Sequence, residues 1–356
     1  MRIEQIKEIA DAVLYEGYLL YPYRQSALKN RTRWTFGVVY PREYSEANGG
    51  IEPWTMHTEC LVEGVKGQVD DISLDITVRF LHLLARTVVQ SEPVKDEHVE
   101  ANAGEWSLAS RFADEPLQEG VEREVSVLDL SLSELIAHPR VVEIDFPGGR
   151  MMDDKGATNQ ASTISTGQVV REQQPIVGAI LLVAEPVREN LFKLSVHIEN
   201  RTPETGEVTS RRDAVLFQSF VSTHTILQVK QGSFISLLDP HEALQPLVKG
   251  CQNLRTWPVL VGNQGERNAM VSSPIILYDY PQIAPESPGA LFDGTEIDEI
   301  LSLRIMTLTD EEKEQMRQDE RTREILERTE ALTPEQFMKL HGAIRELRPI
   351  SEGEKE

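Results

Sequence analysis

Three side chains that can transfer protons or bind metal ions lie close together in the stretch "MHTEC". They are His57, Glu59 and Cys60. The alternating polarity around them predicts a strand, and on a strand Cys60 faces the side opposite to His57 and Glu59. We therefore interpret Cys60 as a core thiol. His57 and Glu59 can converge on an ion if other ligands are supplied, which keeps a metal-dependent enzyme built on His57 and carboxylates as an alternative.

A second group of carboxylates, in the stretch "LFDGTEIDEI", consists of Asp293, Glu296, Asp298 and Glu299. It lacks the spacing of a calcium-binding loop, whereas Asp293 and Glu296 have the spacing of a helix-capping box. The sequence also lacks a glycine-rich phosphate loop, a nucleophile elbow and a zinc-protease motif. We therefore predict no catalytic residue, no metal ligand set and no cofactor.

The stretch from residue 17 to 41 combines aromatic and cationic side chains in an acidic protein. Tyr21 and Tyr23 offer rigid contact area, and four cations follow them: Arg24, Lys29, Arg31 and Arg33. Arginine side chains suit bidentate contacts with carboxylates or phosphate, so one interpretation is an anion-recognising patch. The other is a loop whose charges are neutralised by acidic segments of the same chain.

A proline-rich stretch, "SSPIILYDYPQIAPESPGALFDG", follows a short apolar segment near the end of the predicted β region. Its prolines favour an extended backbone, and on an extended chain Tyr278 and Tyr280 share one face. Such a segment loses little conformational entropy on binding. We expect it to lie against the protein's own sheets or against a partner.

Composition limits the class of protein and of partner. The chain has 356 residues, of which 40% are hydrophobic and 26% charged, and its formal net charge is −22. This is the composition of a soluble globular protein, and its negative field disfavours nucleic acids and anionic membranes. No apolar run is long enough to cross a bilayer as a helix. Proteins are therefore the expected partners, and the oligomeric state is left open.

Two further features indicate the compartment. Cys60 and Cys251 are the only cysteines, too few for a disulfide framework or a tetrahedral zinc site. The first residues, "MRIEQIKEIADAVLYEG", mix charges into an amphipathic pattern and lack the apolar region of a signal peptide. A cytoplasmic location is the expectation.

The pattern of the whole chain predicts an α+β fold with a mainly antiparallel β-sandwich core, because strands follow one another without the helices that a parallel sheet requires. A helix is predicted from the N-terminus to about Gly17. Alternating apolar and polar residues predict strands at 34–41, 57–64, 71–80, 124–130, 141–146, 174–185, 191–200 and 214–229. Long loops are expected near 88–120 and 148–168.

Helix-start signals divide the chain further. "DPHE" predicts a short helix that begins with Asp239 as the N-cap, and Thr309 and Thr333 predict helices over 310–331 and 334–347. We therefore expect a β-rich core domain over residues 1–290 and a C-terminal helical segment over 291–356.

Several long stretches of the sequence resemble the corresponding stretches of a family of uncharacterised bacterial proteins associated with gene clusters for nickel-iron uptake hydrogenases. They include "LYEGYLLYPYRQSALKNRTRWTFGVVYPR", "MHTECLVEG", "TWPVLVG" and "SSPIILYDYPQIAPESPGALFDGTEIDEILSLRIMTLTDEEK", and they extend from residue 14 to about residue 330. The resemblance implies a cytoplasmic, non-catalytic accessory role in assembling, maturing or docking a hydrogenase. It brings no catalytic residues, and its implied partner is a hydrogenase subunit or maturation factor.

Overall fold

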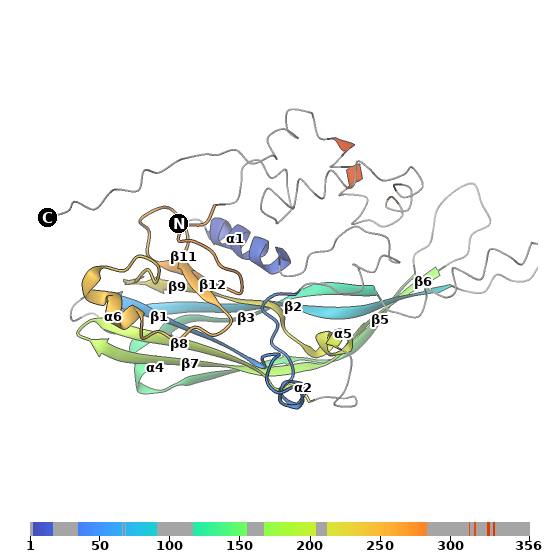
Figure 1. Cartoon of the computed structure of the whole chain (residues 1–356), viewed down its shortest axis with the longest axis horizontal. Coiled ribbons are helices and arrows are strands. Elements are labelled where there is room, and N and C mark those ends of the chain that lie inside the picture. The colour runs from blue at the N-terminus through green and yellow to red at the C-terminus, as the bar shows by residue number, and fades with distance from the viewer. Residues whose placement is uncertain are drawn as a thin grey trace, which may run out of the picture. The chain divides into compact units, whose positions relative to one another are not determined.

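Antiparallel strands make up most of the protein in the computed structural model. The structure describes residues 3–16, 35–65, 67, 69–90, 117–154, 167–203 and 212–282, together with residues 313, 317, 326, 327, 330 and 331. The chain divides into two units: Met1–Tyr18 with Trp34–Pro281, and Leu19–Arg33 with Gln282–Glu356. The first unit carries both sheets (Figure 1). The predicted boundary at residue 290 stays a prediction.

The first sheet has five strands in the order β10-β1-β8-β7-β4, and all of its pairs are antiparallel. Its strands are β1 (Thr55–Gly64), β4 (Arg140–Phe146), β7 (Ile176–Arg188), β8 (Leu191–Asn200) and β10 (Gly232–Phe234). Strands β7 and β8 form a hairpin whose turn places Asn190 at a φ of 60°. Asparagine tolerates this left-handed conformation better than most residues.

The second sheet is organised around the long strand β2 (Ser73–Gln90). One edge of β2 pairs with β3, and its other edge pairs first with β9 and then with β6. Strand β6 continues to β5, and β9 continues through β12 to β11. The bounds are β3 (Leu117–Ser131), β5 (Gly149–Asp154), β6 (Gly167–Gln173), β9 (Val221–Lys230), β11 (Trp257–Leu260) and β12 (Ala269–Ser273).

Helices are short apart from α1 (Ile3–Glu16), which packs against β9 and β2. The others among the described residues of the first unit are α2 (Arg42–Ala47), η2 (Val69–Asp71), α4 (Leu132–Ala137), α5 (Arg212–Val215), η4 (Leu216–Gln218), η5 (Glu242–Leu244) and α6 (Gln245–Val248). In the second unit, residues 313, 317, 326, 327 and 330 are helical. Lys313 Nζ and Arg317 Nη2 each lie 3.6 Å from Glu330 Oε1.

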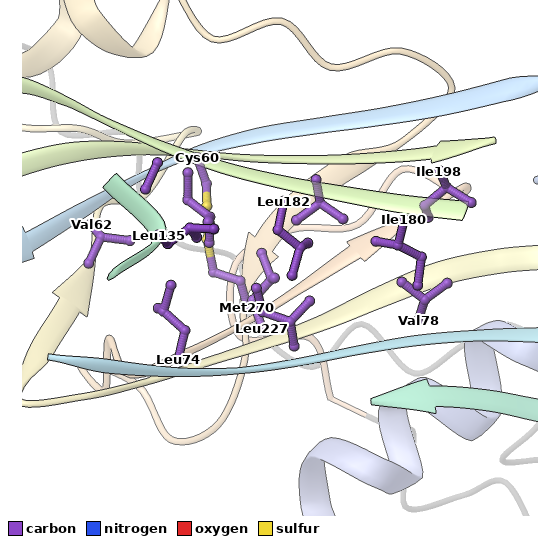
Figure 2. Packing of buried hydrophobic residues seen from close by; sticks show 14 of the residues in the cluster. Cys60, Val62, Leu74, Val78, Leu135, Ile180, Leu182, Ile198, Leu227 and Met270 are labelled. Atoms are coloured by element: carbon purple, nitrogen blue, oxygen red, sulfur yellow. The ribbon is translucent and has the colours of Figure 1, made fainter. Parts of the chain in front are cut away.

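The main hydrophobic core draws side chains from both sheets. Cys60 and Leu182 come from the first sheet, and Leu227 and Met270 come from the second, and all belong to one buried cluster. Figure 2 shows these side chains pointing toward one another between the ribbons. The alternating residues of β2 explain the arrangement, because every second residue from Leu74 to Phe80 is buried in this cluster.

Much of the predicted element pattern is confirmed. The structure is mostly antiparallel β with few helices, and α1 ends at Glu16, close to the predicted end at Gly17. Cys60 lies in the core, whereas His57 is partly exposed on the opposite face of β1. The fold is therefore predictable where the apolar periodicity is regular.

Two predicted strands are wrong in part. Residues 35–41 contain only an isolated bridge between Val39 and Phe220, because Gly37 adopts a φ of 56° and breaks the alternation. The stretch 214–229 begins with helical turns, and its strand starts only at Val221. Both segments still bury apolar side chains, which is why their composition resembled that of strands.

The predicted loops and the "DPHE" helix also need correction. Strand β2 runs to Gln90 and β3 begins at Leu117, so both ends of the predicted loop near 88–120 belong to strands. Strands β5 and β6 likewise occupy the two ends of the predicted loop near 148–168. The short helix near 240 is capped by His241, whose Nδ1 accepts a hydrogen bond from the Ala243 N–H, and not by Asp239. The predicted helix 334–347 lies outside the described residues, and 310–331 is described only at the positions given above.

Among the described residues, no helix is both long enough and apolar enough to cross a membrane.

Candidate functional site

The predicted binding residues fall into two groups in the structure. Tyr21, Tyr23, Arg24, Lys29, Arg31 and Arg33 lie outside the described residues, as do the carboxylates of 293–299. Tyr278 is 83% exposed, whereas Tyr280 packs against the main core with a φ of 57°. The chain is therefore not extended through Tyr280. The prediction that the two tyrosines share one face is wrong because Asp279 anchors the backbone, accepting hydrogen bonds from Ser236 Oγ and the Leu260 N–H.

A row of polar side chains crosses the partly exposed face of β1 and β8. His57 and His197 are direct cross-strand partners, with ring centres 5.5 Å apart. His57 Nε2 lies 3.4 Å from Glu59 Oε1, and His197 Nε2 lies 3.2 Å from Glu199 Oε1. Burial lowers the pKa of His197, the neighbouring Glu199 opposes that shift, and the net direction is downward. Sequence analysis did not pair His197 with His57.

Glu59 is the most enclosed carboxylate of this row, with 7% of the residue exposed. Its oxygens accept from the Gln252 N–H at 2.7 Å and lie 3.3 Å from Lys193 Nζ. Burial raises the pKa of Glu59, but the Gln252 amide, His57 and Lys193 outweigh burial, so the net pKa is lowered. A general base works best with a pKa near the operating pH, and that of Glu59 is shifted the other way.

The metal-dependent alternative gains no support from this row. In the part of the chain that the structure describes, no group of three or more histidine, cysteine or acidic side chains is arranged to hold a metal ion. The Cys60 thiol faces the core, and burial raises its pKa far above the ordinary range. The row is a set of ion pairs and hydrogen bonds that ties the segment at Gln252 to β1.

Two histidines are buried away from this row. His82 and His224 have no exposed surface, and burial lowers the pKa of each to about 4. The carbonyl groups of Gln174 and Phe217 approach His82, although the ring makes no well-aligned hydrogen bond with the described residues. These histidines are neutral core residues at physiological pH.

Five large apolar side chains are exposed in the segments that follow β10 and β12. They are Leu238, Leu254, Trp257, Ile276 and Tyr278, with exposed fractions of 55%, 56%, 43%, 74% and 83%. We call these five residues the apolar surface. Soluble proteins rarely expose large apolar patches without a binding role, and aromatic residues are enriched in protein interfaces.

A hollow of about 230 Å³ lies among these segments. Leu238, Trp257 and Ile276 line it directly, while Leu254 and Tyr278 follow the lining residues Asn253 and Leu277. Its volume is below the roughly 300–1,000 Å³ of typical small-molecule sites. The hollow therefore suits a side chain of another protein better than it suits a cofactor.

The hollow rests on well-anchored backbone. Leu254 exchanges two backbone hydrogen bonds with His57 of β1, at 3.2 and 2.8 Å, and Trp257 pairs with Ser273 of β12. The Asn253 side chain also bonds both backbone groups of Glu59. In Figure 1, α6, β11 and β12 lie near one another toward the left of the view. Sequence analysis identified only Tyr278 of this surface, because its residues come from separate short segments between residues 238 and 278 that share no sequence pattern.

No protein-family model matches this chain, and no curated protein matches it either.

Proposed function

We propose that this protein is a non-catalytic accessory protein that binds a partner protein at the apolar surface. The observation that carries the proposal is the exposure of Leu238, Trp257 and Ile276, which line one hollow, together with the exposed Tyr278 two residues after Ile276. Binding energy at interfaces is concentrated in a few large side chains that fill pockets, with tryptophan and tyrosine the most enriched. The anchored backbone beneath them reduces the entropy lost on association.

The proposal extends to the architecture and the setting. A β-sandwich formed by the two sheets would give the apolar surface a rigid support. The resemblance of long sequence stretches to the family associated with hydrogenase gene clusters supports a nickel-iron hydrogenase subunit or maturation factor as the partner, in the cytoplasm. The role would be assembly, maturation or docking, and the protein would contribute contact surface but no catalytic group.

Capture of the partner from native cells tests this proposal. Tagged wild-type protein should retain one stoichiometric partner, and a double variant carrying Ile276→Ser and Tyr278→Ser should lose it. Both side chains are largely exposed, so the melting temperature should change little. The matched control is Ile51→Ser, which removes an isoleucine that is 76% exposed elsewhere on the first unit.

The partner's identity is read from the same experiment. A hydrogenase subunit or maturation factor in the eluate supports the proposed setting. Equal retention by the double variant and the wild type would show that the apolar surface is not the binding site. Metal bound stoichiometrically to the purified protein would instead favour the metal-dependent enzyme.

A further inference from the structure

The charges beside the apolar surface differ from those of the rest of the molecule. The protein carries 58 acidic and 36 basic residues, yet residues 243–265 contain no acidic residue and residues 268–278 contain no charged residue. The charged side chains of these two segments are Lys249 and Arg255. They follow directly after Val248, which lines the hollow, and Leu254 of the apolar surface. The nearest acidic residues in sequence are Asp239 and Glu242 before the first segment, Glu266 between the two, and Asp279 after the second. The Asp279 carboxylate accepts hydrogen bonds from Ser236 Oγ and the Leu260 N–H.

Both cations are available to a partner. Lys249 and Arg255 are exposed, and neither forms an ion pair with a carboxylate among the residues that the structure describes. Most arginines elsewhere in the first unit behave differently: Arg42, Arg79, Arg150 and Arg171 each lie within 4 Å of a glutamate or aspartate. The two cations beside the hollow therefore stand apart from the protein's own neutralised surface.

The backbone holds Arg255 in a fixed position. Its φ is 65°, a left-handed conformation that is uncommon for a residue other than glycine. The flanking residues impose it: Leu254 is bonded to His57 of β1, and the buried Thr256 hydroxyl contacts Ser272 Oγ at 2.6 Å and donates to the Ser273 carbonyl at 3.2 Å. The backbone at Arg255 is therefore already ordered before a contact forms, which reduces the entropy lost on binding.

We propose that the apolar surface takes a peptide segment of the partner in which an apolar side chain is flanked by acidic residues. This inference rests on the proposed function and specifies the partner's chemistry. The apolar side chain enters the hollow, and the flanking carboxylates contact Lys249 and Arg255. The acidic net charge of the whole protein does not prevent this, because salt screens distant charges over about 8 Å at physiological ionic strength.

A random-peptide display library selected on the full-length protein tests the inference. Enriched peptides should share a large apolar residue with aspartate or glutamate on both sides. A synthetic, fluorescein-labelled copy of the most enriched peptide then serves as the probe for anisotropy measurements. Reversing both charges, with Lys249→Glu and Arg255→Glu, should weaken its binding about tenfold at physiological salt, and rising salt should weaken binding to the wild type.

Matched variants separate charge from folding and from the proposed function. Arg140→Glu reverses an exposed charge on β4 and should leave the affinity unchanged. Trp257→Ala should abolish binding of the probe while Lys249→Gln weakens it less than charge reversal does. Enriched peptides with basic or uncharged flanks, an unaltered affinity of the charge-reversed variant, or no enriched peptide would each overturn the inference. The proposed function would survive all three outcomes if the captured partner still depended on Ile276 and Tyr278.

Discussion

His57 and His197 lie directly opposite each other on β1 and β8, and each ring contacts a glutamate of its own strand. His57 accepts and donates its backbone hydrogen bonds on the side of Leu254, so its pair with His197 is of the kind in which cross-strand side chains approach closely. Glu59 and Glu199 are in turn held by Lys193 and Arg201. Apart from His57 Nδ1, which has no hydrogen-bond partner among the described residues, the charged groups of the row pair with one another. This leaves the apolar surface as the better binding candidate.

Stability should fall as the pH is lowered, because His82 and His224 are buried in the neutral form. Their folded-state pKa of about 4 lies below the ordinary value of 6.5, so the unfolded chain binds more protons between these values. Stability is complete above pH 6.5 and is lost as the pH falls toward 4. Each histidine should contribute up to about 3 kcal/mol to this loss.

Urea unfolding measured across that pH range checks the expectation. His82→Gln and His224→Gln should each flatten the pH dependence, whatever they do to stability at neutral pH. His138→Gln alters an exposed histidine and serves as the control. An unchanged slope in both buried variants would show that these histidines do not resist protonation.

The contact between Asp11 and Arg79 should anchor α1 to the second sheet. Arg79 has 3% of its side chain exposed, and its Nη2 lies 2.6 Å from Asp11 Oδ1. Removing one partner of a buried pair destabilises by about 3–5 kcal/mol. Since Glu122 also contacts Arg79, Asp11→Ala should fall at the lower end of that range. Thermal unfolding should show the loss.

The comparison variant is Glu46→Ala, which breaks the exposed pair of Arg42 and Glu46. Exposed pairs contribute about 0–1 kcal/mol, so this variant should melt close to the wild type. Equal small effects in the two variants would mean that the Asp11–Arg79 contact contributes little to the stability of the folded unit.

Gly178 of β7 should not tolerate a side chain. A Cβ atom there would lie 2.4 Å from the Glu199 carbonyl oxygen and 2.7 Å from Phe220 Cζ. Gly178→Ala should therefore destabilise by about 1–3 kcal/mol through overpacking. Gly149→Ala is the control, because nothing lies within 4 Å of its added Cβ. A wild-type melting temperature for Gly178→Ala would contradict the packing of β7 against β8.

The elements predicted best from the sequence are those that bury a single face, because burial of one face gives a regular alternation of apolar and polar residues. In β2 one face is buried, so its alternation is regular, and α1 buries Ile6, Ala10 and Val13 at helical spacing. Residues 38–40 are all buried, because Val39 packs in the main core while Val38 and Tyr40 pack in another cluster. Three consecutive buried residues give neither the period of a one-sided strand nor that of a helix. The apolar surface was unpredictable for a different reason: it is assembled by tertiary contacts between segments that have no joint sequence pattern.

Photo-crosslinking from position 278 tests the central claim most directly. A photoreactive amino acid in place of Tyr278, whose side chain is 83% exposed, should form one adduct with the captured partner. The same amino acid in place of Leu128, which is 65% exposed on β3, should form none. The account predicts an adduct at 278 that disappears when Trp257→Ala is added. Equal adducts at both positions, or an adduct at 128 alone, would contradict the assignment of the apolar surface as the binding site.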